Sequence, residues 1–163
     1  MQKKITVADI IMLVGGAVAF LFSFLKFASG RGAPNAWDTD FFAFATTLPA
    51  LLGLAMAVWI VLGLAGVALP EQVLTFNSDQ LKATWGIAAA GIMLSWITTD
   101  FDKGVGYWLM LLGSLAMAVG AVMALLGKGT ETVDIPGGSK DTASATSSEA
   151  SSTPPPPPPA TDA

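Results

Sequence analysis

Two acidic pairs are the side chains in this sequence with the clearest capacity for chemistry. Asp38 and Asp40 are separated by one residue, and so are Asp100 and Asp102. Closely spaced carboxylates can hold a calcium or magnesium ion, and a pair of them can act as acid and base in hydrolysis. If the two segments that carry these pairs meet, four carboxylates converge on one face of the protein.

The acidic pairs also have a simpler interpretation, as solvated loop residues or as partners of Arg31 and Lys103. Neither pair has the glycine that an EF-hand loop requires, and no nucleophile or pocket signature accompanies them. The chain has no cysteine and no histidine, which removes thiolate chemistry, the commonest general base and the commonest metal ligand. We therefore expect no catalytic residue, no metal site and no cofactor, and we predict that the protein is not an enzyme.

The elements that position these loops are strongly apolar. Hydrophobic residues make up 53% of the 163 residues and charged residues 12%, about half the usual share of a soluble domain. The net charge is −4 and no basic run exists, so nucleic acid is not an expected partner. Such a composition predicts a protein whose apolar surface is solvated by lipid.

Four apolar blocks, each bracketed by charged or helix-breaking residues, predict an all-α integral membrane four-helix bundle. The predicted spans are about 7–27, 46–69, 83–99 and 105–127 within a domain 1–128. The blocks are apolar all round, which argues against a soluble bundle. A cleaved signal peptide is an alternative for the first block, but that block is long and rich in phenylalanine to its end.

Helix boundaries can be predicted from local signals. We expect Pro49 in the first turn of the second helix, with Thr46 or Thr47 as its cap. Asn77 to Asp79 forms a turn or caps the third helix, and Lys82 flanks that helix.

Positive charge and aromatic residues predict how the spans lie in the bilayer. Lys3 and Lys4 precede the first helix, which favours a multi-pass protein of the cell membrane with both termini in the cytoplasm. Aromatic residues near the span ends are predicted to anchor at the membrane interface. These anchors are Trp37, Trp85, Trp96, Tyr107 and Trp108.

Small residues recur at four-residue spacing on three of the predicted helices, where they let helix backbones approach closely in lipid. The positions are Gly53 and Ala57, Gly86 and Ala90, and Ala116, Gly120 and Ala124. They serve either packing within the bundle, which we favour, or oligomerisation. We expect Ser23, Ser95 and Ser114 to make interhelical hydrogen bonds or bonds to the backbone carbonyl four residues earlier, and the methionines to fill the core.

Residues 129–163 are rich in Ser, Thr and Ala and contain a run from Pro154 to Pro159. This composition predicts a disordered tail that ends in a polyproline II rod. The rod is either a spacer or a ligand for an aromatic groove in a partner.

Three segments carry a recognisable pattern: Phe20-Leu-Phe22-Ser-Phe24, Asn35-Ala-Trp37-Asp38 and Lys103-Gly-Val-Gly-Tyr-Trp108. With them the chain resembles a group of small, uncharacterised actinobacterial four-span membrane proteins. The resemblance covers about residues 7–127 and implies four spans in a cell membrane, with no catalytic residue. The chain departs from the group after the first helix, where Lys26-Phe-Ala-Ser replaces an aromatic-rich stretch.

We hypothesise from the sequence that the protein is a non-enzymatic membrane interaction or scaffold protein. The partners expected are membrane lipid and either a second copy of the chain or another membrane protein. The alternative is a small oligomeric pore or carrier for a neutral or lipid-like solute, since four thin helices hardly enclose a channel.

Overall fold

The computed structural model describes residues 4–38, 43–70, 72–73 and 75–134. Within these ranges the chain is mostly helical and contains four α-helices. The elements are β1 (Lys4–Thr6), α1 (Val7–Phe22), α2 (Ala43–Ala65), β2 (Gln72–Val73), β3 (Phe76–Asn77), α3 (Ser78–Ser95), the 3-10 turn η1 (Trp96–Thr98), α4 (Val105–Leu125) and β4 (Thr132–Asp134).

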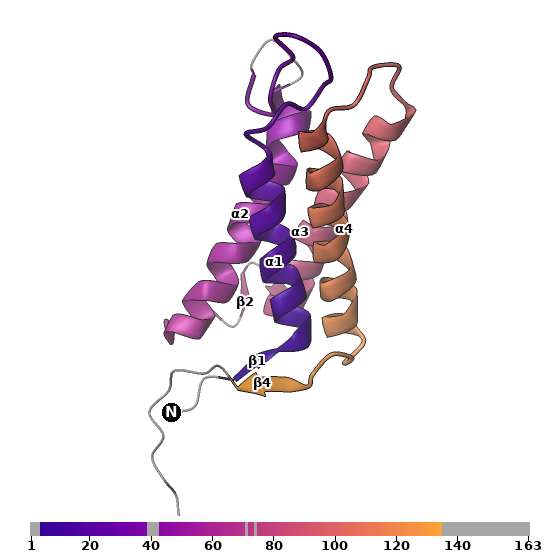
Figure 1. The fold of residues 1–163 in the computed structure, drawn as a ribbon. Helices are drawn as coiled ribbons and strands as arrows, with labels where there is room; N and C mark the ends of the chain where they lie inside the picture. Colours follow the sequence, from indigo (N-terminus) through magenta and orange to yellow (C-terminus); the bar gives the residue numbers. More distant parts are fainter. Residues whose placement is uncertain (1–3, 39–42, 71, 74, 135–163) are drawn as a thin grey trace, which may run out of the picture.

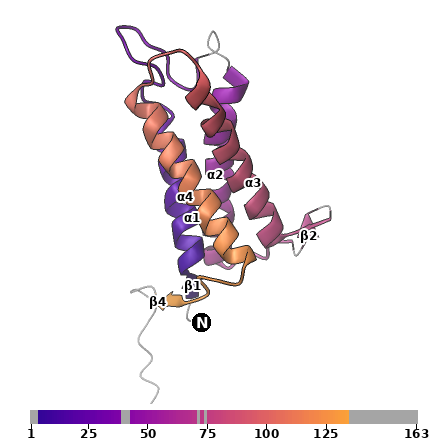
Figure 2. The same cartoon turned by 90° about the vertical axis from the view of Figure 1, so that its right-hand side faces the viewer.

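The four helices run alternately up and down and form a ring (Figure 1). Each helix packs against the next along the chain, and α1 packs against α4, which closes the ring. The segments between α1 and α2 and between α3 and α4 lie at one end, which we call the loop end (Figure 2). The start of α1 and the end of α4 lie at the other, which we call the terminal end.

Helix α1 ends at Phe22, so the predicted first span of 7–27 is too long by five residues. The Ser23 hydroxyl donates to the Phe20 carbonyl, and the Ser23 carbonyl accepts from the Ala36 backbone N–H. The chain then runs on in extended form, where the Phe27 carbonyl accepts from the Gly104 N–H. Backbone pairing with distant segments replaces the last predicted turn of the helix.

Helix α2 begins at Ala43 and ends at Ala65, not at 46 and 69. Pro49 therefore lies in the second turn, and the predicted capping role of Thr46 is wrong because its hydroxyl donates to the Ala36 carbonyl. Proline cannot donate to the Ala45 carbonyl four residues earlier. The Trp96 indole N–H reaches that carbonyl instead, at 3.5 Å.

The end of α2 and the start of α3 follow from backbone signals that hydropathy does not register. Gly66 adopts a left-handed φ of 78° and stops α2 four residues before the predicted boundary. Asn77 caps α3 in a reciprocal capping box with Gln80, so α3 begins at Ser78 rather than 83. At its other end α3 gives way to η1, short of the predicted 99, whereas α4 ends at Leu125, close to the predicted 127.

The first residues of the predicted tail are part of the fold. Strand β4 pairs antiparallel with β1, with Ile5 opposite Val133. The N–H groups of Val7 and Ala8, at the start of α1, donate to the carbonyls of Glu131 and Gly129. These bonds satisfy backbone donors that a helix start leaves unpaired, so the tail prediction is wrong for 129–134. Residues 135–163, including the proline run, lie outside the described residues.

Close helix contacts in the ring are made through glycine. A methyl group on Gly15 would lie 2.7 Å from the Gly113 carbonyl oxygen of α4, and one on Gly16 would lie 2.5 Å from the Gly53 carbonyl oxygen of α2. These pairs are reciprocal, because a methyl on Gly113 or Gly53 would meet α1 in the same way. Helix α1 thus touches both neighbours backbone to backbone.

The predicted small-residue faces lie largely inside the bundle. Gly53 faces α1, a methyl on Gly86 would lie 3.0 Å from the Met117 carbonyl of α4, and one on Gly120 would lie 2.8 Å from the Met12 side chain. Their companions pack similarly or line nearby cavities: Ala57 beside Gly16, Ala90 buried, Ala116 against Gly15 and Ala124 at the terminal end. These contacts favour packing within the bundle over oligomerisation.

Two helices, α2 from Phe44 and α4, are long and apolar enough to cross a membrane. Only 28% of the most apolar stretch of α2 and 39% of that of α4 is buried. Helix α1 is equally apolar in character but shorter. The outer surface of α2 and α4 is therefore apolar over most of its length.

Candidate functional site

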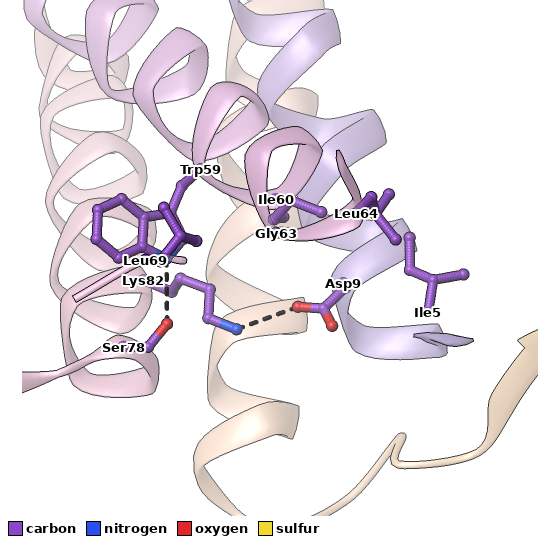
Figure 3. Close-up of a pocket in the computed structure, with 9 residues that line it drawn as sticks. All are labelled: Ile5, Asp9, Trp59, Ile60, Gly63, Leu64, Leu69, Ser78 and Lys82. Atoms are coloured by element: carbon purple, nitrogen blue, oxygen red, sulfur yellow. Dashed lines mark hydrogen bonds and ion pairs between the residues drawn. The ribbon is translucent and has the colours of Figure 1, made fainter. Parts of the chain in front are cut away.

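An ion-pair cluster lies at the terminal end, where a lysine that is largely buried pairs with two aspartates (Figure 3). The Lys82 ammonium on α3 lies 3.1 Å from a carboxylate oxygen of Asp9 on α1 and 3.0 Å from one of Asp79. The side chain of Lys82 is 11% exposed and that of Asp9 is 24% exposed, whereas Asp79 is 53% exposed. One buried cation is thus held between two carboxylates, which leaves the cluster with a formal charge of −1.

Two capped helix starts place these charges. Thr6 caps α1: its side chain accepts from the Asp9 N–H at 3.1 Å, and its hydroxyl donates to the second Asp9 carboxylate oxygen at 2.7 Å. The Asn77 cap of α3 sets Lys82 about one turn into that helix, on its inner face. Carboxylates suit a helix N-terminus and an ammonium does not, so Lys82 depends on its two acidic partners.

A half-open cavity of about 200 Å³ lies on one side of the ion pair. Its lining combines the charged residues of α1 and α3 with apolar side chains from α2 and the segment that follows it. The lining residues are Ile5, Asp9, Trp59, Ile60, Gly63, Leu64, Leu69, Ser78 and Lys82 (Figure 3). The Trp59 indole N–H donates to the Ser78 hydroxyl at 3.1 Å, which fixes the ring at the cavity wall.

A smaller cavity of about 120 Å³ borders the same ion pair on the side of α4. Asp79 and Lys128 line this second cavity, and neither lines the first. Asp9 and Lys82 line both, so they form a polar partition across the terminal end of the ring. The arrangement can hold a small polar or charged group; it presents an ion pair, not a nucleophile with a base.

Sequence reasoning missed this cluster because Lys82 was expected to flank a helix from 83 onward. The signal that could have found it is the Asn77-to-Gln80 capping box, which starts α3 five residues earlier. A helix that begins at 78 gives Lys82 an inward-facing position, and Asp9 lies in the first turn of α1 at the same end.

The predicted acidic cluster at the loop end is not assembled in the described residues. The two segments do meet, but through their backbones: the Ser29 N–H donates to the Asp102 carbonyl at 2.7 Å. Asp100 and Asp102 point their exposed side chains to the surface, and Asp38 is exposed as well. No group of three or more acidic, histidine or cysteine side chains with metal-binding geometry occurs in the described part of the chain, and Asp40 lies outside it.

Lys103, considered from the sequence as a partner for those acids, is held by other groups. Its ammonium donates to the carbonyls of Thr99 at 2.9 Å and Phe101 at 3.3 Å, and it lies 4.9 Å from the centre of the Phe101 ring. These contacts stabilise the tight connection between α3 and α4.

Two of the predicted interface anchors lie inside the bundle instead. Tyr107 is fully buried and its hydroxyl donates to the Met93 carbonyl at 3.0 Å, and Trp96 is 8% exposed. Both pack around the buried Phe27 ring, because the extended segment after α1 inserts between α3 and α4 at the loop end. Burial leaves these two side chains little surface with which to anchor at an interface.

The other three anchors reach the surface to different degrees. Trp108 is half exposed. Trp37 is partly buried; it stacks on Phe24 and donates to the Ser23 hydroxyl at 2.8 Å. Trp85 is partly buried and packs edge-to-face on Trp59. These three positions are compatible with an interface role, which stays a prediction.

The serine hydrogen bonds differ from the prediction in their spacing. Ser23 and Ser95 donate to backbone carbonyls three residues earlier, not four. Ser114, fully buried in α4, has no hydrogen-bond partner among the described residues. The methionines fill the core as predicted: the fully buried ones are Met12, Met56, Met93, Met110 and Met117.

Comparison with known proteins adds no assignment to this geometry. No protein-family model, curated protein or solved structure matches the chain. The resemblance to actinobacterial four-span proteins stays an expectation.

Proposed function

We propose that the chain is an integral membrane protein in which all four helices cross the bilayer. The support is the distribution of charge and apolar surface. No charged side chain occurs in the middle of any described helix. The uncharged stretches are residues 10–25 of α1 and the segment after it, all of α2 and α4, and residues 83–95 of α3. Large apolar side chains are exposed on each helix, such as Leu21, Val58, Ile87 and Leu112. An uncharged band with an apolar exterior suits lipid and not water.

The length of the helices agrees with this placement. At about 1.5 Å per residue, the 21 residues of α4 extend about 31 Å, close to a hydrocarbon core of about 30 Å. Helix α1 has 16 residues and is shorter, but the extended segment after it continues toward the loop end. The lysines before α1 favour a cytoplasmic terminal end, with the loop end outside.

Within the membrane we propose an interaction or scaffold role rather than catalysis. The observation that carries this proposal is the packed core: among the described residues, glycine backbones and methionine side chains fill the middle of the ring. What the molecule presents is apolar surface along its length and a polar cluster at one end. Both features suit binding to lipid or to another membrane protein, and a pore would need several copies.

Cysteine labelling tests the topology cleanly because the chain has no native cysteine. Arg31→Cys at the loop end and Thr130→Cys at the terminal end are both exposed positions. In intact cells a membrane-impermeant maleimide should modify the first variant alone, and the second should react only after permeabilisation. Equal labelling of both in intact cells, or recovery of the protein from the soluble fraction without detergent, would refute the proposal.

The interaction role needs its own test. A photo-crosslinking residue at the exposed Ile87 should give a discrete protein adduct in native membranes, whereas the same residue at the buried Met117 should not. If Ile87 yields only lipid adducts and the chain migrates as a monomer, the scaffold role fails. Self-association of the chain together with solute flux through reconstituted vesicles would instead favour the oligomeric pore or carrier.

A further inference from the structure

The cavity of about 200 Å³ at the terminal end has a lining suited to a ligand that carries two opposite charges. Asp9 and Lys82 both border it, 3.1 Å apart. A ligand with a single charge would be attracted by one of these groups and repelled by the other. A small zwitterion can place each of its charges against the opposite partner.

Both partners have hydrogen-bonding capacity left for such a ligand. An ammonium has three N–H donors, and among the described residues Lys82 uses two of them, on Asp9 and Asp79. One donor is therefore left for a ligand. Each carboxylate oxygen of Asp9 accepts one hydrogen bond, from Lys82 or from Thr6, and each can accept a second.

Trp59 forms an aromatic part of the cavity wall next to Lys82. Its ring is held at the wall by the bond from its N–H to Ser78, and it lies beside Lys82 (Figure 3). The Lys82 ammonium lies between this ring and Asp9 (Figure 3), so a ligand ammonium would have the Asp9 carboxylate as its partner, while a ligand anion would pair with Lys82.

The size and place of the cavity define the ligand further. A volume of about 200 Å³ corresponds to roughly seven water molecules at about 30 Å³ each, which is close to the size of an aminoethyl phosphate group. Apolar side chains of α2 and its C-terminal extension form the rest of the wall, such as Leu64 and Leu69. The cavity therefore lies where the uncharged band of the bundle gives way to polar residues.

We propose that this cavity binds an aminoethyl phosphate group, the headgroup chemistry of phosphatidylethanolamine. The phosphate pairs with Lys82, and the primary ammonium donates to Asp9. A choline group cannot donate these hydrogen bonds, so phosphatidylcholine binds more weakly. The assignment of a membrane lipid as the source depends on the proposed membrane location; the same chemistry is carried in water by glycerophosphoethanolamine.

A steric variant tests the cavity without touching its charges. A methyl on Gly63 would lie 3.6 Å from Leu69, so Gly63→Leu can be accommodated by filling the cavity. Gly91→Leu is the matched control, since nothing lies within 4 Å of a methyl there. The full chain is placed in phosphatidylcholine nanodiscs that contain a minor fraction of phosphatidylethanolamine, and retained lipids are identified by native mass spectrometry.

We expect the wild type and Gly91→Leu to retain phosphatidylethanolamine over phosphatidylcholine by about tenfold, the effect of one charge-assisted hydrogen bond. Gly63→Leu should lose this preference. The neutral double variant Asp9→Asn with Lys82→Met should lose it too, whereas Asp79→Asn, which does not line this cavity, should keep it. Equal retention in Gly63→Leu and wild type, or no preference in the wild type, would overturn the proposal for lipid.

A soluble arm separates the two sources of the headgroup. Glycerophosphoethanolamine is added to the protein in phosphatidylcholine nanodiscs or detergent, and its binding is measured by calorimetry. Binding that Gly63→Leu abolishes supports the cavity even if no lipid is selected. No binding in either arm refutes it. A chain that fails to enter nanodiscs refutes the membrane location alone, because the calorimetric arm can still be measured in detergent.

Discussion

The contact between Gly15 and Gly113 gives the sharpest prediction about stability. In Gly15→Ala the new methyl would lie 2.7 Å from the Gly113 carbonyl oxygen and 2.8 Å from the Met117 nitrogen. Both are backbone atoms of α4, so neither can rotate away. Helices α1 and α4 would have to separate by roughly 0.8 Å to restore an ordinary contact of about 3.5 Å.

The energetic cost follows from that displacement. A gap of 0.5–1 Å removes about a quarter to a half of the dispersion attraction of each contact along the interface. Overpacking of this kind costs about 1–3 kcal/mol of unfolding free energy. The higher helix propensity of alanine offsets up to about 1 kcal/mol in water, and this term must be removed by a control.

Gly91→Ala supplies the control because it makes the same chemical change on α3 at a site with nothing within 4 Å of the new methyl. The propensity term is common to both variants, so the difference in their unfolding free energies isolates the packing cost. We expect Gly15→Ala to be less stable than Gly91→Ala by about 1–3 kcal/mol in equilibrium unfolding in detergent micelles. If Gly15→Ala is as stable as Gly91→Ala, the backbone contact between α1 and α4 is wrong.

Three further variants test other contacts by the same unfolding measurement. Lys82→Met leaves Asp9 partly buried without its cation and should lower the unfolding free energy by up to about 3 kcal/mol. The double variant Asp9→Asn with Lys82→Met should recover most of that loss, and no recovery would contradict the ion pair. Ser114→Ala removes a buried hydroxyl without a partner and should be neutral or stabilising by about 1 kcal/mol, so a marked loss of stability would reveal a bond that the described residues do not contain. Asn77→Ala removes the cap of α3 and should lower the unfolding free energy by about 1 kcal/mol. Gln80→Ala should lower it less, because it removes only the reciprocal bond, and the reverse order would argue against the capping box.

Hydropathy predicted the number and order of the helices because charged or helix-breaking residues separate four long apolar segments. It placed their ends less well, by up to five residues, for a physical reason. Helix ends depend on single groups that satisfy backbone atoms, such as the Asn77 side chain or the left-handed Gly66. A window average over many residues does not register one cap.

The sequence predicted that helices would approach closely at small residues, but it did not predict which residues they would meet on the neighbouring helix. Small residues at four-residue spacing predicted close backbone approach, and Gly53, Gly86 and Gly120 make it. The partners on α1, Gly15 and Gly16, are adjacent residues and do not follow that spacing. Adjacent positions on a helix point in directions about 100° apart, so one residue faces α4 and the other α2. That arrangement depends on α1 having two neighbours, which only the fold determines.

The buried ion pair joins the two helices that the ring leaves apart. Helices α1 and α3 lie diagonally opposite and otherwise scarcely touch, yet Asp9 and Lys82 connect them. In lipid the hydrophobic effect does not select which apolar helices pack together. Glycine contacts lie on three sides of the ring, between α1 and α2, α1 and α4, and α3 and α4, and the ion pair fixes one diagonal at the terminal end. The same pair separates two cavities, so the group that specifies the packing also forms the wall of the proposed binding site. A ligand that bridges Asp9 and Lys82 would therefore stabilise the fold and occupy the site through the same contacts.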